Sequence, residues 1–306
     1  MNDEIKIAAF GISCLDYVCL IETQDANRNG KISAFKEVIG GLTGNAVLAA
    51  KRLGATVNLV SIFGKDEIQK KVFTMLNQEE INTQFCQIIE NRKSLFSFIT
   101  IDKENGNRSI FSHKDNIPDK EIEVDFTFLN GTFALLLDVH WKKASLKTAK
   151  EAKHRCIPVI GDLRISSENL DTLKYIDYPI VSIDYVLSLE EKKQDLKTAL
   201  YLMKDAGATC PIITAGGIGS FYIDDKGNLI NIPAFKINPV DTCGAGDVFH
   251  GAFAFAICKY DLRQALIFAS AAAALKCTRF GGGSGAPTFN EVMIFLKKYN
   301  IYDRRY

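Results

Sequence analysis

Neither sign of charge is in excess in this sequence. Its 306 residues carry 37 Lys and Arg against 36 Asp and Glu, a formal net charge of +1. This balance gives no broad electrostatic reason to expect nucleic acid or a membrane surface as a partner. A small-molecule partner is the better expectation.

Paired cysteine motifs are also missing. The eight cysteines are scattered, with no Cys-x-x-Cys pair and no zinc-type spacing. We therefore expect them to be reduced, mostly buried thiols of a cytoplasmic protein.

The chain has no apolar run long enough to cross a bilayer, which takes about 20 residues; Ile5–Ile12 and Ala265–Leu275 both fall short. We also see no targeting segment, internal repeat, low-complexity tract or Pro/Ser-rich linker. Because 47% hydrophobic content is ample for a buried core, we expect a single domain over residues 1–306.

Short apolar strands alternate with helical segments along most of the chain. The spacing predicts an α/β fold: a doubly wound, mostly parallel sheet with helices on both faces and ligands at the carboxyl ends of the strands. Asp138 and Asp162 stand at two such ends. The expected strands are Ile5–Phe10, Val57–Phe63, Ala134–Val139, Ile157–Ile160, Pro179–Ser182 and Pro211–Thr214, and the expected helices include Ala46–Leu53, Ala144–Arg155, Lys192–Asp205, Leu262–Leu275 and Glu291–Lys298.

Two further pairs of β-forming segments lie outside this alternation. Tyr17–Ile21 and Ile32–Ile39 flank one polar loop, and Leu95–Ile101 and Arg108–His113 flank another. Strands outside the main sheet leave an edge or an apolar face to cover, so we predict a homodimer formed through them.

The segment 241–247, Asp-Thr-Cys-Gly-Ala-Gly-Asp, leads directly into an apolar, alanine-rich helix. The amides of Gly244, Ala245 and Gly246 can point at one spot, where the helix N-terminus adds partial positive charge, so the turn predicts an anion hole. Asp247 falls in the first turn, where we expect it to be ionised and able to accept a proton from a hydroxyl. The plainer alternative is that the aspartates only cap a helix.

This string resembles the Asp-Thr-x-Gly-Ala-Gly-Asp signature of the ribokinase-like (PfkB) carbohydrate kinases. The resemblance spans residues 5–296 and implies transfer of the γ-phosphoryl group of ATP, with Mg²⁺, to a sugar hydroxyl. Asp247 would be the catalytic base, and the 244–246 amides would stabilise charge on the phosphate. It also implies that the extra strands, from about 14–40 and 93–116, form a small β-sheet lid over the sugar.

The remaining site residues follow from the same resemblance. Sugar contacts would come from the segment ending in Asp16, from the Gly-Gly-x-x-x-Asn motif at 40–45 and from Asp138; ATP contacts would come from a second glycine turn and the nucleotide side of the signature. The implied sugar-binding residues are Asp16, Gly40, Gly41, Asn45 and Asp138, and the implied ATP-binding residues are Asp162, Thr214, Gly216, Gly219, Thr242 and Gly244.

The branch most similar in motif is that of the bacterial sulfofructose kinases. At the positions that hold the sulfonate there, this chain has Lys31, Ser112 and His140, so only the lysine remains. An imidazole largely neutral near pH 7 replaces a charged arginine, and we therefore expect a neutral ketose or pentose as the substrate. A sulfofructose or sugar-phosphate kinase, a nucleoside kinase and a non-catalytic sugar-binding regulator remain alternatives.

Metal handling departs from the family pattern. Where many members carry Asn-x-x-Glu, this chain has Ser182-Ile-Asp184-Tyr185, so Asp184 could take part of that role, or Mg²⁺ could be held mainly by ATP and water. A K⁺ ion beside the anion hole is a second possibility, although a loop without any ion is an equal alternative. The positions matching the family's monovalent-cation site are Asp241, Cys243, Lys276, Arg279, Gly281 and Gly285.

Overall fold

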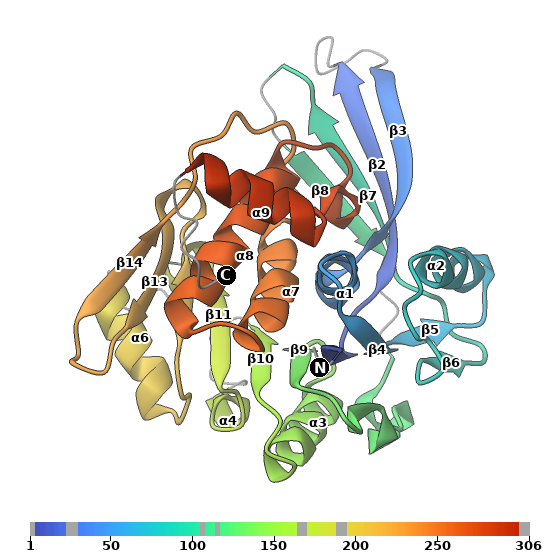
Figure 1. Ribbon diagram of the computed structural model, residues 1–306. Helices are drawn as coiled ribbons and strands as arrows, with labels where there is room; N and C mark the ends of the chain where they lie inside the picture. The colour runs from blue at the N-terminus through green and yellow to red at the C-terminus, as the bar shows by residue number, and fades with distance from the viewer. Residues whose placement is uncertain are drawn as a thin grey trace.

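The computed structural model describes residues 4–22, 30–104, 108–113, 117–163, 170–187 and 195–299. Within them, one large sheet and one small sheet stand on either side of a group of helices (Figure 1). The large sheet has the strand order β14-β13-β12-β11-β10-β9-β1-β4. Its strands are β1 (Lys6–Phe10), β4 (Thr56–Val60), β9 (Ala134–Asp138), β10 (Val159–Asp162), β11 (Tyr178–Ser182), β12 (Ile212–Thr214), β13 (Gly219–Ile223) and β14 (Leu229–Pro233).

The strands from β4 to β12 are parallel, and β13 and β14 extend the sheet as an antiparallel hairpin. Parallel neighbours need a crossover, which the intervening helices supply. The helices are α1 (Leu42–Arg52), α2 (Glu67–Gln78), α3 (Lys142–His154), α4 (Leu170–Leu173), α5 (Ile183–Leu187), α6 (Leu196–Asp205), α7 (Ala245–Ile257), α8 (Leu262–Cys277) and α9 (Phe289–Lys298).

Two apolar clusters occupy the two faces of the large sheet. Side chains from α1, α7, α8 and α9 join one, and side chains from α3 and α6 join the other. Figure 1 shows the same division, with α7 and α8 on one side of the strands and α3 on the other. The predicted doubly wound α/β fold with helices on both faces is thus confirmed.

A glycine brings α7 against α1. A Cβ atom at Gly251 would lie 2.0 Å from the carbonyl oxygen of Ala46, so only glycine permits this approach of the two helix backbones. The close packing matters for the site because Asn45 and Asp247 lie near the N-terminal ends of these two helices.

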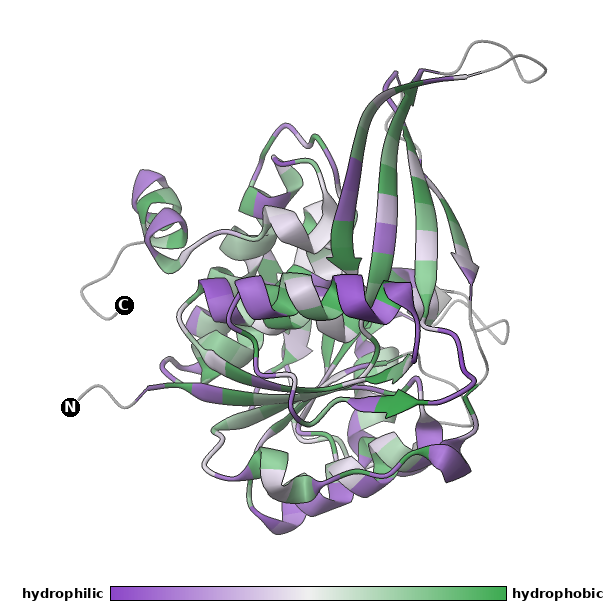
Figure 2. Cartoon of the chain, turned by 90° about the vertical axis from the view of Figure 1, so that its right-hand side faces the viewer, coloured by the Kyte–Doolittle hydropathy of each residue, from purple (hydrophilic) through white to green (hydrophobic). Residues whose placement is uncertain are grey.

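The small sheet has the order β3-β2-β7-β8 and consists of β2 (Cys14–Glu22), β3 (Lys31–Gly40), β7 (Phe96–Asp102) and β8 (Arg108–His113). It stands away from the large sheet (Figure 2). This is the small β-sheet that the sequence predicted as a lid. Parts of the two predicted lid segments, residues 23–29, 105–107 and 114–116, lie outside the described residues.

One predicted strand is wrong in its extent. The apolar run Val57–Phe63 is divided at Ser61 into β4 and the short β5 (Ile62–Gly64), which pairs with β6 (Gln87–Ile89) in a separate sheet. The hydroxyl of Ser61 accepts a hydrogen bond from the backbone N–H of Ser13 at 3.0 Å, which explains why a polar residue is buried at the break. Among the described residues, no helix is long and apolar enough to span a membrane.

Candidate active site

Several chain segments that are distant in sequence meet at the carboxyl ends of β1, β9 and β10. Gly11 follows β1, Asp138 ends β9 and Asp162 ends β10. The N-terminal ends of α1 and α7 approach the same edge. This is the edge of a doubly wound sheet at which ligands are expected.

The turn before α7 has the backbone form that an anion-binding turn requires. Gly244 is the N-cap of α7 with φ of 73°, in the left-handed region that glycine accepts easily. The helix starts at Ala245, whose backbone N–H donates to the carbonyl of Thr242 at 3.2 Å. The next amides of the first turn have no partner within the helix and can point at a ligand. Gly246 is exposed, and a Cβ atom there would meet nothing within 4 Å.

Asp247 lies in the first turn of α7 and is held by Asn45. The side-chain amide of Asn45 donates to Oδ2 of Asp247 at 2.7 Å, across 202 residues of sequence. The backbone N–H of Gly283 in turn donates to Oδ1 of Asn45 at 3.1 Å. Both ends of the Asn45 amide are therefore engaged, which fixes the direction in which the Asp247 carboxyl points.

The expected ionisation of Asp247 needs correction. Burial, with the nearby charge of Asp162, raises the pKa of Asp247 to about 7, although the bond from Asn45 and the proximity of His250 act in the opposite direction. The cost of placing a charge in a poorly solvated position beside another carboxylate therefore outweighs the hydrogen bond from Asn45. A pKa near neutral is well matched to a general base.

Asp16 lies on β2 where the small sheet joins the site. It is 8% exposed, and burial raises its pKa to about 6 against the opposing hydrogen bonds of Cys14 and Ser97. A Cβ atom at Gly40 would lie 2.1 Å from the Asp16 carboxyl, so glycine is required beside it. Gly41, with φ of 83°, caps α1 and lies against the backbone of Ile12.

Asp138 is placed differently from the expectation of a sugar contact. It is 1% exposed and accepts hydrogen bonds from the backbone N–H of Ile12 (2.6 Å), the hydroxyl of Thr43 (2.8 Å) and the backbone N–H of His140 (3.0 Å). Burial raises its pKa to about 6 despite these bonds. Its carboxyl thus joins the loop after β1 to the start of α1 beneath the surface of the site.

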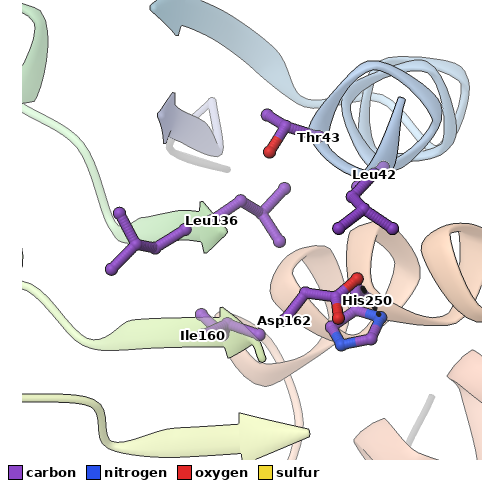
Figure 3. Close-up of a pocket in the computed structure, with 8 residues that line it drawn as sticks. Leu42, Thr43, Leu136, Ile160, Asp162 and His250 are labelled. Carbon is purple, nitrogen blue, oxygen red and sulfur yellow. Dashed lines mark ion pairs between the residues drawn. The ribbon is translucent and has the colours of Figure 1, made fainter. Parts of the chain in front are cut away.

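A cavity of about 10 Å³, the space that one water molecule needs, lies between α1, α7 and the ends of β9 and β10. Asp162 and His250 line it together with apolar side chains (Figure 3), and Nδ1 of His250 is 3.9 Å from Oδ2 of Asp162. The His250 ring also lies between two carbonyl oxygens, that of Gly246 at 2.7 Å and that of Ile180 at 3.3 Å. Sequence reasoning missed His250, although a polar residue one turn after Asp247 in an apolar helix was a usable signal.

Three of the residues predicted for ATP, Thr214, Gly216 and Gly219, lie on the same edge of the sheet, at the end of β12. Thr214 ends this strand, and the turn that follows is open: Gly216 is exposed with φ of 49°, and no atom lies within 4 Å of the position of its missing Cβ. Gly219, with φ of 119°, closes the turn against the carbonyl of Ile232. Thr242 is exposed just before the turn at Gly244.

Of the three positions matched to a sulfonate site, the structure places Lys31 far from Asp16. Lys31 pairs with Glu22 at the far end of β2 and β3, six residues along β2 from Asp16, or about 20 Å. Its ammonium lies 3.8 Å from the Glu22 carboxylate. Within one chain, Lys31 thus lies far from Asp16, and its contact with a substrate stays a prediction. Ser112 contacts Ser97 in the sheet (3.1 Å), and His140 is exposed after β9 with its ring against Trp141.

A lysine closer to the site was missed. Lys36 pairs with Val18, on the face of the small sheet that carries Asp16, and its ammonium donates to the carbonyl of Phe280 at 3.2 Å. Side chains alternate between the two faces of a strand, so Lys36 can be assigned to the Asp16 face once the pairing register of β2 and β3 is known.

Several of the residues predicted for a monovalent-cation site come together, but they surround the ammonium group of Lys276. The ammonium of Lys276 donates to the backbone carbonyl of Asp241 at 2.7 Å and lies 3.5 Å from its Oδ2. The Asp241 carboxylate accepts from the backbone N–H groups of Cys243, Gly281 and Gly282 at 2.8, 2.9 and 3.2 Å. Although burial opposes it, Lys276 and these amides hold the pKa of Asp241 below its usual value. Arg279 pairs with Glu291 and reaches the carbonyl of Gly285 at 3.5 Å.

The described residues contain no group of three or more His, Cys, Asp or Glu side chains arranged to hold a metal ion. Asp184 is exposed in α5, with its Oδ2 3.5 Å from the hydroxyl of Ser182. This edge of the sheet presents glycine-containing turns and carboxylates.

Comparison with known proteins agrees with this arrangement. Residues 4–289 match the sequence profile described as "pfkB family carbohydrate kinase". The chain belongs to the PfkB family of carbohydrate kinases. A PfkB kinase is a phosphotransferase with an alcohol group as acceptor, and this one is a sugar kinase of the ribokinase type.

Among curated relatives, this PfkB kinase is 27% identical to Fructokinase-2 of Zea mays, with 96% of this chain and 95% of the relative covered. It is 28% identical to the ribokinase of Haemophilus influenzae, with 84% and 87% covered. Among solved structures, the Arabidopsis thaliana ribokinase complexed with ribose and ATP has a TM-score of 0.79 at 20% identity, covering 96% of this chain and 99% of that one. At that identity, the likeness is one of fold.

Proposed function

We propose that this PfkB kinase transfers the γ-phosphoryl group of ATP to a primary hydroxyl of a neutral ketose or pentose. Asp247 acts as the general base, and the amides of Gly244, Ala245 and Gly246 stabilise the charge on the transferring phosphate. The observation that carries the proposal is the placement of a carboxyl with a pKa of about 7, aimed by Asn45, within the first turn of a helix that begins at a left-handed glycine.

The sugar is bound between the first strands of the lid and the start of α1. Asp16 accepts hydrogen bonds from sugar hydroxyls, and Gly40 and Gly41 let the backbone approach the ring. Asn45 holds the base, and Asp138 positions the loop after β1 rather than touching the sugar. The lid closes over this region and keeps out water that could otherwise accept the phosphate.

ATP lies along the carboxyl ends of β10 to β12. The open turn 214–219 receives its phosphates, with Thr242 and Asp162 near the transferring group. A solved Escherichia coli structure of the ribokinase type contains ATP and Mg²⁺. We propose that Mg²⁺ is held here mainly by ATP and water, because this ion loses its hydration shell reluctantly. Asp184, in the segment that stands where many members carry Asn-x-x-Glu, takes at most part of that role.

A neutral substrate is supported by the position of Lys31 at the far end of the lid and by His140, which stands where the resemblance would place a charged arginine. Without a lysine and an arginine at the site, an anionic substituent loses charge-assisted contacts worth about tenfold or more in affinity. The sugar kinases named fructokinase and ribokinase among the relatives are consistent with neutral acceptors.

The test compares kcat/KM for fructose, ribose, fructose 6-phosphate and sulfofructose with ATP, with a nucleoside included as acceptor. We expect fructose or ribose to be preferred. An advantage of about tenfold or more for either anionic sugar over both neutral ones would refute the substrate assignment. Preference for the nucleoside would replace it with a nucleoside kinase, and failure of every acceptor would leave a sugar-binding regulator.

A further inference from the structure

Lys276, in the last turn of α8, is fully buried. Burying an ammonium is costly unless its charge is matched by polar partners. Its partners are the carbonyl and carboxylate of Asp241, the first residue of the segment that forms the anion-binding turn. The same turn of α8 holds this segment a second way, because the backbone N–H groups of Val240 and Asp241 donate to the carbonyl of Cys277 at 2.7 and 3.1 Å.

Lysine and arginine side chains of this chain also donate hydrogen bonds to carbonyl oxygens of the neighbouring loop 279–286. Lys36 donates to the carbonyl of Phe280, Arg279 to that of Gly285, and Arg52 to those of Ser284 and Ala286. The carbonyl of Gly281 accepts from the hydroxyl of Ser284. A monovalent metal ion needs several oxygens free to replace its hydration shell. The carbonyl of Asp241 and most carbonyls of this loop, those of Phe280, Gly281, Ser284, Gly285 and Ala286, already have cationic or hydroxyl partners, so the donor set does not fit such an ion.

Hydrogen bonds on either side of the Gly282–Gly283 peptide link connect Lys276 to the proposed catalytic carboxyl. The Asp241 carboxylate accepts from Gly281 and Gly282, the next amide, Gly283, donates to Asn45, and Asn45 donates to Asp247. A Cβ atom at Gly244 would lie 3.1 Å from the nitrogen of Gly283, so the loop and the anion-binding turn touch directly. A change at Lys276 therefore reaches both parts of the proposed machinery.

We propose that the Lys276 ammonium is a built-in cation that fixes the anion-binding turn and the 281–283 amides relative to Asp247, so that this kinase requires no monovalent metal ion. Lys276 is a positioning residue, since it acts on the phosphate and the base through Asp241 and the loop. The catalytic part of this inference rests on the proposed function, whereas the dependence of stability on cations does not.

The test uses wild type, Lys276→Met, Lys276→Ala and, as a matched control, Lys298→Met on the exposed end of α9. Thermal unfolding and kcat are measured in potassium chloride, ammonium chloride, methylammonium chloride and tetramethylammonium chloride at equal ionic strength of about 0.1 M. Wild type and Lys298→Met should give the same Tm and kcat in all four salts.

Lys276→Met should lower Tm by roughly 5–15 °C, because it leaves Asp241 buried without its cation. Its kcat should fall by about 10²-fold with the KM for ATP much less affected, as expected for a displaced catalytic group. Lys276→Ala leaves room for a small cation, so ammonium, methylammonium or K⁺ should recover part of its Tm and kcat, whereas tetramethylammonium should not.

A rise in wild-type Tm or kcat specific to K⁺ would overturn the proposal, as would wild-type Tm and kcat in Lys276→Met. If Lys276→Met does not fold, the wild-type comparison and recovery of Lys276→Ala still decide. If wild type phosphorylates no sugar, the proposed function fails, but the Tm measurements still test whether Lys276 replaces an external cation.

Discussion

Replacing Asp247 by asparagine should separate the catalytic value of this residue from its cost to stability. The pKa of Asp247 is raised from 3.8 to about 7. Between these values the folded protein binds more protons than the unfolded chain, so this carboxyl lowers the free energy of unfolding as pH rises through that range. A shift of about 3 pKa units lowers the free energy of unfolding by at most about 4 kcal/mol, and this reduction is complete above about pH 7.

The asparagine side chain carries no charge, and its oxygen can still accept from the amide of Asn45. We therefore expect Asp247→Asn to be more stable than wild type at pH 8, by about 1–4 kcal/mol, and close to wild type at pH 4. Turnover should fall by about 10²–10⁴-fold because the general base is lost, while ATP binding is retained. Urea unfolding at the two pH values, calorimetric ATP titration and steady-state kinetics measure the three quantities.

Asp261→Asn is the matched control. Asp261 is the exposed N-cap of α8, and asparagine caps a helix about as well as aspartate. It should leave turnover unchanged and give no stability gain at pH 8. Wild-type turnover in Asp247→Asn would remove Asp247 from the mechanism, and a variant no more stable than wild type at pH 8 would show that its carboxyl is not held at a raised pKa.

Three further predictions concern the same elements. The kcat/KM of wild type should rise with pH through about 7, and Asp162→Asn should move this limb to lower pH, because the charge of Asp162 raises the pKa of Asp247; an unmoved limb would contradict the coupling. Gly246→Val should leave Tm nearly unchanged, since the space beside Gly246 is open, but should lower kcat by about 10-fold or more by crowding the phosphate; unchanged kinetics would place the phosphate elsewhere. The lid has an exposed apolar face, which includes Phe111 at 64% exposure, and we expect two chains to form a homodimer through it. Light scattering at micromolar concentration should find a dimer for wild type and a monomer for Phe111→Lys. A monomeric wild type would refute the interface.

The order of strands and helices was readable from the sequence because the chain alternates short apolar runs with helical segments. The lid strands also matched, since their polar loops mark their ends. The break at Ser61 was not readable, because a serine within an apolar run shows its partner only when Ser13 is brought beside it.

Within the site, the local motif revealed the turn at Gly244 and the position of Asp247, but not the state of the Asp247 carboxyl. That state depends on Asp162 and on burial by distant segments, which no local pattern contains. The distance of Lys31 from Asp16 depends on the register of β2 and β3, which the sequence does not specify. The full burial of Lys276 depends on how α8 packs in the folded protein, which its local sequence does not show.

The bond between Asn45 and Asp247 has a consequence for the timing of assembly. At about 5–20 residues per second, a ribosome takes roughly 10–40 s to make the 202 residues that separate them. Throughout that interval, the nascent chain can carry a paired lid hairpin and α1, yet Asn45 has neither Asp247 nor Gly283 to bind. Phosphoryl-transfer activity should therefore be among the last properties to appear during synthesis or refolding, later than secondary structure measured by circular dichroism.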